Sequence, residues 1–156
     1  MSSHDFELLT GVEPEHVREI SALGRTSTLQ TGQTLFRLGD TADSLFVIDR
    51  GRVALTLPME VRDRSEDILI EERGPGQTVG WSALIPPHRF TLTASALIET
   101  DVLTLPRTAL LDYFSAHPAV GYTITRNIAA VAGQRLQVFQ AMWLREMQRV
   151  VKLSYA

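Results

Sequence analysis

Between Ser27 and Leu105, apolar and polar residues alternate in short runs that glycine, aspartate and proline separate. A period of two is typical of strands with one buried face. Strands this short and evenly spaced indicate an antiparallel sandwich or roll. The pair Arg50-Gly51 joins the runs SLFVID and RVALTL, and it predicts a tight hairpin because glycine accepts a positive φ. We therefore expect a β-roll over about residues 27–106.

Before this region the apolar period is helical. Residues 13–23 place Val17, Ile20 and Leu23 on one face, between Pro14 at the start and Gly24 at the end. This pattern predicts a short amphipathic helix.

After Pro106 the helical period returns. A short helix is expected to stop before His117-Pro118, and a long helix is expected from about Ala119 towards Val151, within C-terminal helices over residues 107–153. Helix, roll and helices together predict one domain, residues 1–156, whose fold class is mainly β with flanking helices.

The long helix fits a heptad pattern. One seam takes Ala129, Leu136, Trp143 and Val150, and the other takes Ala132, Phe139, Glu146 and Leu153. One interpretation is a helix packed on its own roll, which accounts for part of its length. Because the apolar positions continue beyond what one small roll covers, we expect a homodimer through Leu136, Phe139, Trp143 and Val150.

The composition excludes several classes of protein. There is no cysteine, so the chain has neither disulfides nor thiolate metal sites. No apolar run is long enough to span a bilayer, and the first residues lack a signal-peptide pattern, so we expect a cytoplasmic protein without a membrane segment. A net charge of −3 repels nucleic acid only slightly.

The segments GQTLFRLGDTADSLFVIDRGRVAL, RGPGQTVG and TDVLTLPR, in that order, resemble the cyclic-nucleotide-binding domain. This family includes the β-rolls of catabolite activator-type transcription factors, kinase regulatory subunits and gated ion channels. The resemblance covers roughly Phe6 to the end, and its glycine framework is Gly32, Gly39-Asp40, Gly51, Gly76 and Gly80. It implies a jelly roll, or double-stranded β-helix, with a short N-terminal and a long C-terminal helix. The implied role is signal transduction by a stand-alone regulatory domain.

The resemblance also implies a phosphate-binding cassette that begins at Gly80. In the family a helical turn presents backbone N–H groups to the cyclic phosphate, as helix starts do for anions. An acidic residue directly after the glycine binds the ribose hydroxyl, and an arginine at the head of the next strand pairs with the phosphate. Here Gly80, Ser82, Ala83 and Leu84 fit the turn, but the acidic position holds Trp81, whose indole donates a hydrogen bond and accepts none.

Arg89 and Phe90 compete for the arginine position. Alternation along FTLTASA turns Phe90 and every second residue after it inward, which leaves Arg89 pointing outward. The alternative is a bulge after Pro86-Pro87 that rotates Arg89 inward. Thr91 holds a position where the family often places a hydroxyl near the ligand. The candidate ligand-binding residues are Gly80, Trp81, Ser82, Ala83, Leu84, Arg89, Phe90 and Thr91.

Two rival functions are not favoured. DNA-binding relatives carry a helix-turn-helix after the long helix, and no such pattern follows here, so we expect no direct DNA binding. The basic residues Arg135, Arg145, Arg149 and Lys152 are interpreted as a solvated face. Catalysis and metal binding are not expected either, because His4, His16, His88 and His117 form no His-x-His pair and no recognisable motif.

Two hypotheses remain. The first is a sensor that binds a cyclic nucleotide or another small ligand, requires no cofactor, and signals through its long helix to an effector protein. The second is a ligand-independent protein interaction module that keeps only the fold. We favour a regulatory domain whose family-style recognition of cAMP and cGMP is impaired or altered, because Trp81 and Phe90 replace the acid and the arginine.

Overall fold

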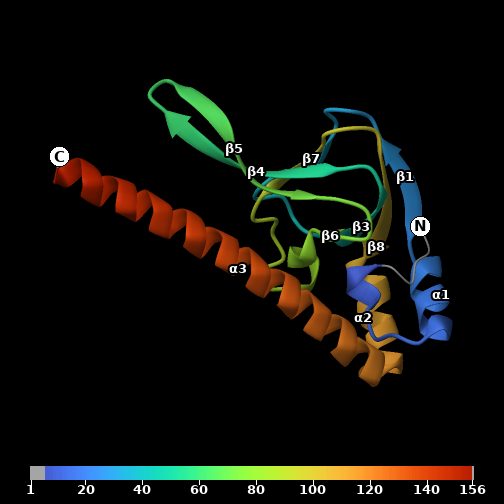
Figure 1. Cartoon of the computed structure of the whole chain (residues 1–156). Coiled ribbons are helices and arrows are strands. Elements are labelled where there is room, and N and C mark those ends of the chain that lie inside the picture. Colours follow the sequence, from blue (N-terminus) through green and yellow to red (C-terminus); the bar gives the residue numbers. More distant parts are fainter. Residues whose placement is uncertain (1–5, 156) are drawn as a thin grey trace.

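The computed structural model describes residues 6–155. Within this range eight strands form two four-stranded antiparallel sheets (Figure 1). The sheet orders are β1-β8-β3-β6 and β2-β7-β4-β5. The strands are β1 (Arg25–Leu29), β2 (Thr34–Phe36), β3 (Ser44–Arg50), β4 (Val53–Val61), β5 (Arg64–Arg73), β6 (Thr78–Val79), β7 (Thr93–Ala96) and β8 (Thr100–Pro106).

The helices lie at both ends of the chain. A 3-10 turn, η2 (Glu7–Leu9), precedes α1 (Pro14–Ala22), and a second such turn, η3 (Trp81–Leu84), lies between β6 and β7. After the roll, α2 (Arg107–Ala116) leads into the long α3 (Pro118–Ser154). The predicted fold class, a β-roll with a short N-terminal and a long C-terminal helix, is confirmed. Among the described residues no helix combines the length and the apolar character that a bilayer span requires.

The core lies between the two sheets and extends beneath the helices. Alternate strand residues such as Leu45, Val47 and Leu105 are fully buried, as the period of two requires. Ile20 of α1 and Leu110 of α2 are also fully buried, so both short helices pack against the roll. One continuous apolar cluster therefore fixes the helices relative to the sheets.

The predicted hairpin at Arg50-Gly51 is wrong. Gly51 does have a positive φ of 105°, and an added Cβ would lie 2.6 Å from the Thr100 Cα, so the tight turn needs glycine. However, β3 pairs with β6 and β8, whereas β4 pairs with β5 and β7, so this turn passes the chain from one sheet to the other. The long hairpin is β4–β5, which turns at residues 62–63.

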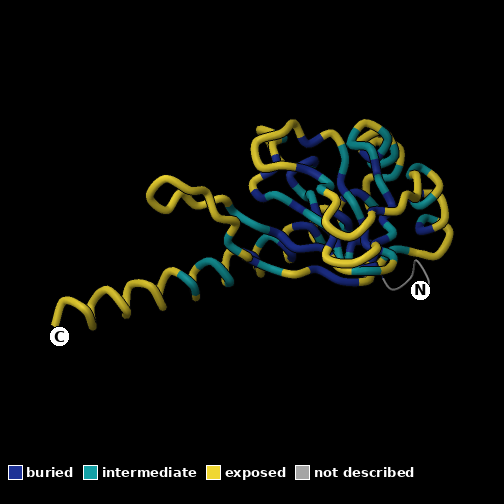
Figure 2. The backbone as a smooth tube through the Cα atoms, turned by 90° about the horizontal axis from the view of Figure 1, so that it is seen from above, coloured by how far each residue is buried: buried dark blue, intermediate teal, exposed yellow. Residues whose placement is uncertain are grey.

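Two elements project from the roll. In Figure 1 the β4–β5 hairpin and the C-terminal half of α3 extend on the same side of the molecule. Figure 2 shows that both projections are exposed, whereas the first half of α3 lies against the roll. Only the N-terminal part of α3 is therefore part of the folded core.

Candidate functional site

The conformation of Gly80, the first residue of the cassette, allows the turn that follows it. Gly80 has a φ of 79°, in the left-handed region, and caps the short turn η3. The turn is closed by hydrogen bonds from the Ala83 N–H to the Gly80 carbonyl (3.1 Å) and from the Ile85 N–H to the Ser82 carbonyl (3.1 Å). A Cβ on residue 80 would lie 3.1–3.4 Å from three phenylalanine rings, so space as well as φ requires glycine here.

Those three rings fill the interior beside the turn. Phe90 and Phe36 stack with their centroids 3.8 Å apart and their planes at 13°, and Phe46 stacks on Phe36 at 5.8 Å. Phe36 and Phe90 are buried. Stacking of this kind adds to the free energy gained by burying the rings. The cassette region is thus packed by side chains of the chain itself.

The space left over is small. The hollow next to Gly80 has a volume of about 10 Å³, which holds about one water molecule. Small-molecule pockets usually measure about 300–1,000 Å³. In this conformation the hollow does not hold a nucleotide.

The structure brings some of the predicted ligand-binding residues together and not others. Gly80, Trp81, Ser82, Phe90 and Thr91 line the hollow. Ala83 is buried within the turn and Leu84 is half-buried against the core, but neither lines the hollow. Their roles in ligand binding stay predictions.

Arg89 lies outside the hollow. Its guanidinium Nη1 donates to the Gly39 carbonyl at 3.0 Å, and its backbone forms an isolated antiparallel bridge with Thr41. The side chain is exposed, so the inward rotation by a bulge is not seen. The next residue, Phe90, points inward, and Leu92, Ala94 and Ala96 are buried with it. The inward-facing position just before β7 is therefore occupied by a phenyl ring.

A cation does reach the hollow, but from α3. Arg135 is only 7% exposed and lines the hollow opposite Trp81, with its guanidinium carbon 5.8 Å from the indole centroid. Its Nε donates to Glu71 Oε2 at 2.8 Å. Its Nη2 has no hydrogen-bond partner among the described residues. The interpretation of Arg135 as part of a solvated basic face is therefore wrong.

The sequence does contain a signal for this placement. Ile124, Ile128 and Val131 form the buried face of α3, and Arg135 follows Val131 by one turn. A helix face that points into the core for three turns carries its next residue in the same direction. Arg135 was nevertheless interpreted as exposed, because arginine is rarely buried without a partner and the sequence does not show that partner.

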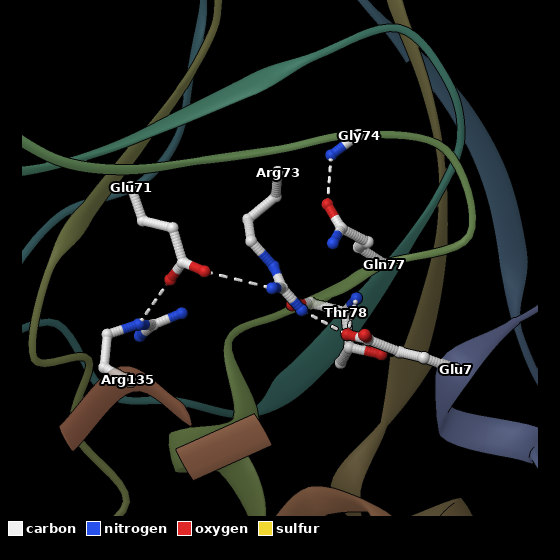
Figure 3. A network of polar contacts seen from close by, with 7 residues as sticks. All are labelled: Glu7, Glu71, Arg73, Gly74, Gln77, Thr78 and Arg135. Carbon is white, nitrogen blue, oxygen red and sulfur yellow. Dashed lines mark hydrogen bonds and ion pairs between the residues drawn. The ribbon is translucent and has the colours of Figure 1, made fainter. Parts of the chain in front are cut away.

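That partner belongs to a four-residue ion-pair network, shown in Figure 3. Glu71 on β5 accepts from Arg135 and also from Arg73 Nη1 at 3.1 Å. Arg73, 3% exposed, donates to Glu7 of η2 and through Nε to the Thr78 carbonyl at 3.3 Å. Two carboxylates thus face two guanidinium groups, and the network joins η2, β5 and α3. Buried ions are tolerable when paired in this way.

The predicted dimer residues of α3 divide into two groups. Phe139 is half-buried and packs against the roll's core, so part of its surface is already covered within one protomer. Leu136, Trp143 and Val150 are exposed by 59%, 63% and 50%. With Leu144, Met147 and Val151 they form an apolar surface that we call the α3 stripe. A patch of this kind on a single helix is typical of an interaction surface.

Comparison with known proteins identifies a matching protein family and several similar proteins. The family model described as "Cyclic nucleotide-binding domain" matches residues 26–117. The chain is 30% identical to glutaminase 2 of Bradyrhizobium diazoefficiens over 131 residues, which are 83% of this chain and 19% of that protein. It therefore spans about a fifth of the length of this relative.

Solved structures agree on the fold. The N-terminal domain of a transcriptional regulator from Streptomyces coelicolor superposes with a TM-score of 0.71 at 27% identity, covering 86% of this chain and 94% of that one. The catabolite activator protein of Thermus thermophilus gives a TM-score of 0.72 at 22% identity, covering 91% and 63%.

Proposed function

The chain belongs to the cyclic nucleotide-binding domain family, and we propose that it is a non-catalytic regulatory domain whose cassette has lost the family's recognition of cAMP and cGMP. The observation that carries the proposal is the stacked Phe36–Phe90 pair beside Gly80. It occupies the region in which the resemblance expects an arginine and a phosphate.

Electrostatics argue against a cyclic nucleotide in this cassette. A cyclic phosphodiester carries one negative charge, and burying an anion without a partner costs several kcal/mol. Arg89 cannot supply that partner where it lies, because it is exposed and bonded to the Gly39 carbonyl, and Arg135, which lines the hollow, is already paired with Glu71. Trp81 offers no acceptor for a ribose hydroxyl. Neither half of the ligand meets the group that the family uses to hold it.

Packing argues in the same direction. The hollow of about 10 Å³ is lined by Phe36, Phe90 and Trp81, and a nucleotide would have to push at least one of these side chains aside. Truncating one buried phenyl ring to alanine costs about 3–5 kcal/mol, which sets the scale of the contacts that such a displacement would break. The interaction free energy of the nucleotide would have to exceed this cost before any net affinity is observed.

Self-association through α3 fits a regulatory role that does not depend on a nucleotide. The α3 stripe continues beyond the roll, so a second copy of the chain would cover it with an equivalent stripe in a two-fold arrangement. The proposal therefore includes a homodimer through Leu136, Trp143 and Val150, with Phe139 at the edge. This surface also favours the second candidate function, a ligand-independent interaction module that binds an effector protein.

Titration calorimetry with cAMP and cGMP tests the proposal. We expect no heat of binding for either nucleotide at about 100 µM protein, a concentration that detects affinities of roughly −5 kcal/mol or better. A sub-micromolar dissociation constant for either one overturns the proposal. The variant Arg89→Gln is the matched control: if any weak heat is seen, it should be unchanged in this variant, because Arg89 lies outside the hollow.

A further inference from the structure

A cluster of metal-ligating side chains lies away from the cassette, where α1 meets the corner between α2 and α3. His16 and Glu19 lie one turn apart on α1, and His117 lies between α2 and α3. One nitrogen from each imidazole and one carboxylate oxygen of Glu19 lie within 4.8 Å of one another. Both histidines are half-buried and Glu19 is exposed, so solvent has access to one side.

Hydrogen bonds through Tyr113 of α2 determine which imidazole nitrogens are free. The Tyr113 hydroxyl donates its single proton to Glu19 Oε2 at 2.8 Å. His16 Nδ1, 2.6 Å from the same hydroxyl oxygen, must therefore donate to it. His117 Nδ1 lies 3.2 Å from the Tyr113 carbonyl, which can only accept. In the neutral form both rings thus carry their lone pair on Nε2.

This arrangement is the one that metal-ligating histidines usually have. A ligating imidazole commonly donates its other ring N–H to a carbonyl, carboxylate or hydroxyl, and this fixes the tautomer before the metal arrives. Here the supporting bonds are already made, and Glu19 keeps its second oxygen without a bond to Tyr113.

We propose that His16, Glu19 and His117 form a binding site for a divalent first-row transition metal, with zinc as the working probe. Two imidazole nitrogens and one carboxylate oxygen suit this class of ion better than calcium or magnesium, which prefer all-oxygen sites. Tetrahedral zinc at about 2.0–2.1 Å holds two ligand atoms roughly 3.4 Å apart. The ligand atoms lie within 4.8 Å of one another, so the side chains have to move together by at most about 1.4 Å to reach this spacing.

The ion would join parts of the chain that are far apart in sequence. It would tie α1 to the point where α3 leaves α2, and a fourth coordination position would remain for water or for a donor from a partner. The sequence did not predict this site, because the expected pattern was a His-x-His strand pair. His16 lies on α1 and His117 lies between α2 and α3, and only the fold brings them together.

The test uses the full chain after dialysis against a chelator. Calorimetry with zinc should show saturable binding of one ion per chain, with a dissociation constant below about 10 µM. Cobalt should give the visible absorption bands of a site with nitrogen and oxygen ligands. The apparent melting temperature should rise with zinc concentration, because the ion binds the folded state.

Three variants probe the ligands. Glu19→Gln keeps the size of the side chain and an acceptor for Tyr113, and His16→Gln and His117→Gln each remove an imidazole. Each should weaken zinc binding by about tenfold or more. Glu19 is exposed, so Glu19→Gln should fold and still tests the proposed site if a histidine variant fails to fold.

The matched control removes the chain's other two histidines in His4→Gln/His88→Gln. His88 lies in the cassette loop, where its Nδ1 lies 3.0 Å from the Ala83 carbonyl, and His4 is outside the described residues. This control should bind zinc like the wild type. The proposal is overturned if the wild type binds no zinc at 100 µM, if the control abolishes binding, or if Glu19→Gln leaves affinity unchanged.

Discussion

Phe90→Ala is the substitution that most directly probes the filled cassette. Phe90 is 6% exposed and stacks on Phe36 at 3.8 Å. Loss of the buried ring forfeits about 1.5–3 kcal/mol of transfer free energy. The existing hollow is only about 10 Å³, so the ring leaves a new cavity on the order of 100 Å³, which adds about 2.4 kcal/mol at roughly 24 cal/mol per Å³. The expected loss of unfolding free energy is therefore about 4–5 kcal/mol.

Urea unfolding followed by circular dichroism measures this loss. The wild type and the variant are compared at one protein concentration, because self-association makes the apparent stability concentration-dependent. The matched control is Thr91→Ala, whose side chain is exposed on the neighbouring position, and it should stay within about 0.5 kcal/mol of the wild type. A loss below about 1.5 kcal/mol for Phe90→Ala, with an unchanged m-value, refutes the argument that this ring fills the cassette.

Two further predictions concern α3 and Tyr113. The double variant Trp143→Asp/Val150→Asp should convert a dimer to a monomer in light scattering, whereas the control Arg145→Asp should not. Trp143 and Val150 are exposed, unlike Phe139, so the roll of the double variant should remain folded. A wild type that is already monomeric at high concentration contradicts the homodimer. Burial, and then the hydrogen bond to Glu19, raises the pKa of Tyr113 to about 12. Tyrosinate absorbance of the metal-free protein should therefore include one group with a pKa of about 12, which Tyr113→Phe removes. Because the folded pKa is the higher one, the stability from this group is complete below about pH 10 and is lost as the pH rises towards 12. If the group that Tyr113→Phe removes titrates at the ordinary tyrosine value of 10.0, this reasoning is refuted.

The sequence predicted the features that repeat with a fixed period. Alternation along FTLTASA places Phe90 inward, and the structure buries Phe90, Leu92, Ala94 and Ala96. This succeeds because a strand with one buried face ties every second side chain to the core, whatever its partners are.

The sequence failed where a partner in space decides the outcome. Gly51 fixes a local reversal of the chain, but it does not determine whether the next strand joins the same sheet, and β4 joins the other one. Arg135 was assigned to solvent because its partner Glu71 lies 64 residues away in the chain. The cluster of His16, Glu19 and His117 was missed for the same reason, because these residues meet only when α1 packs on α2.

The ion pair between Arg135 and Glu71 constrains any regulation that acts through α3. Lifting α3 from the roll would separate Arg135 from Glu71, two largely buried charges, and would also expose the buried residues Ile128 and Val131 of the same helix face. An input that moves α3 must therefore offer Arg135 or Glu71 a better partner, since only differential affinity shifts an equilibrium. Arg135 lines the hollow beside Trp81, and its Nη2 has no hydrogen-bond partner among the described residues, so an anion that reached this nitrogen would compete with Glu71 for the guanidinium.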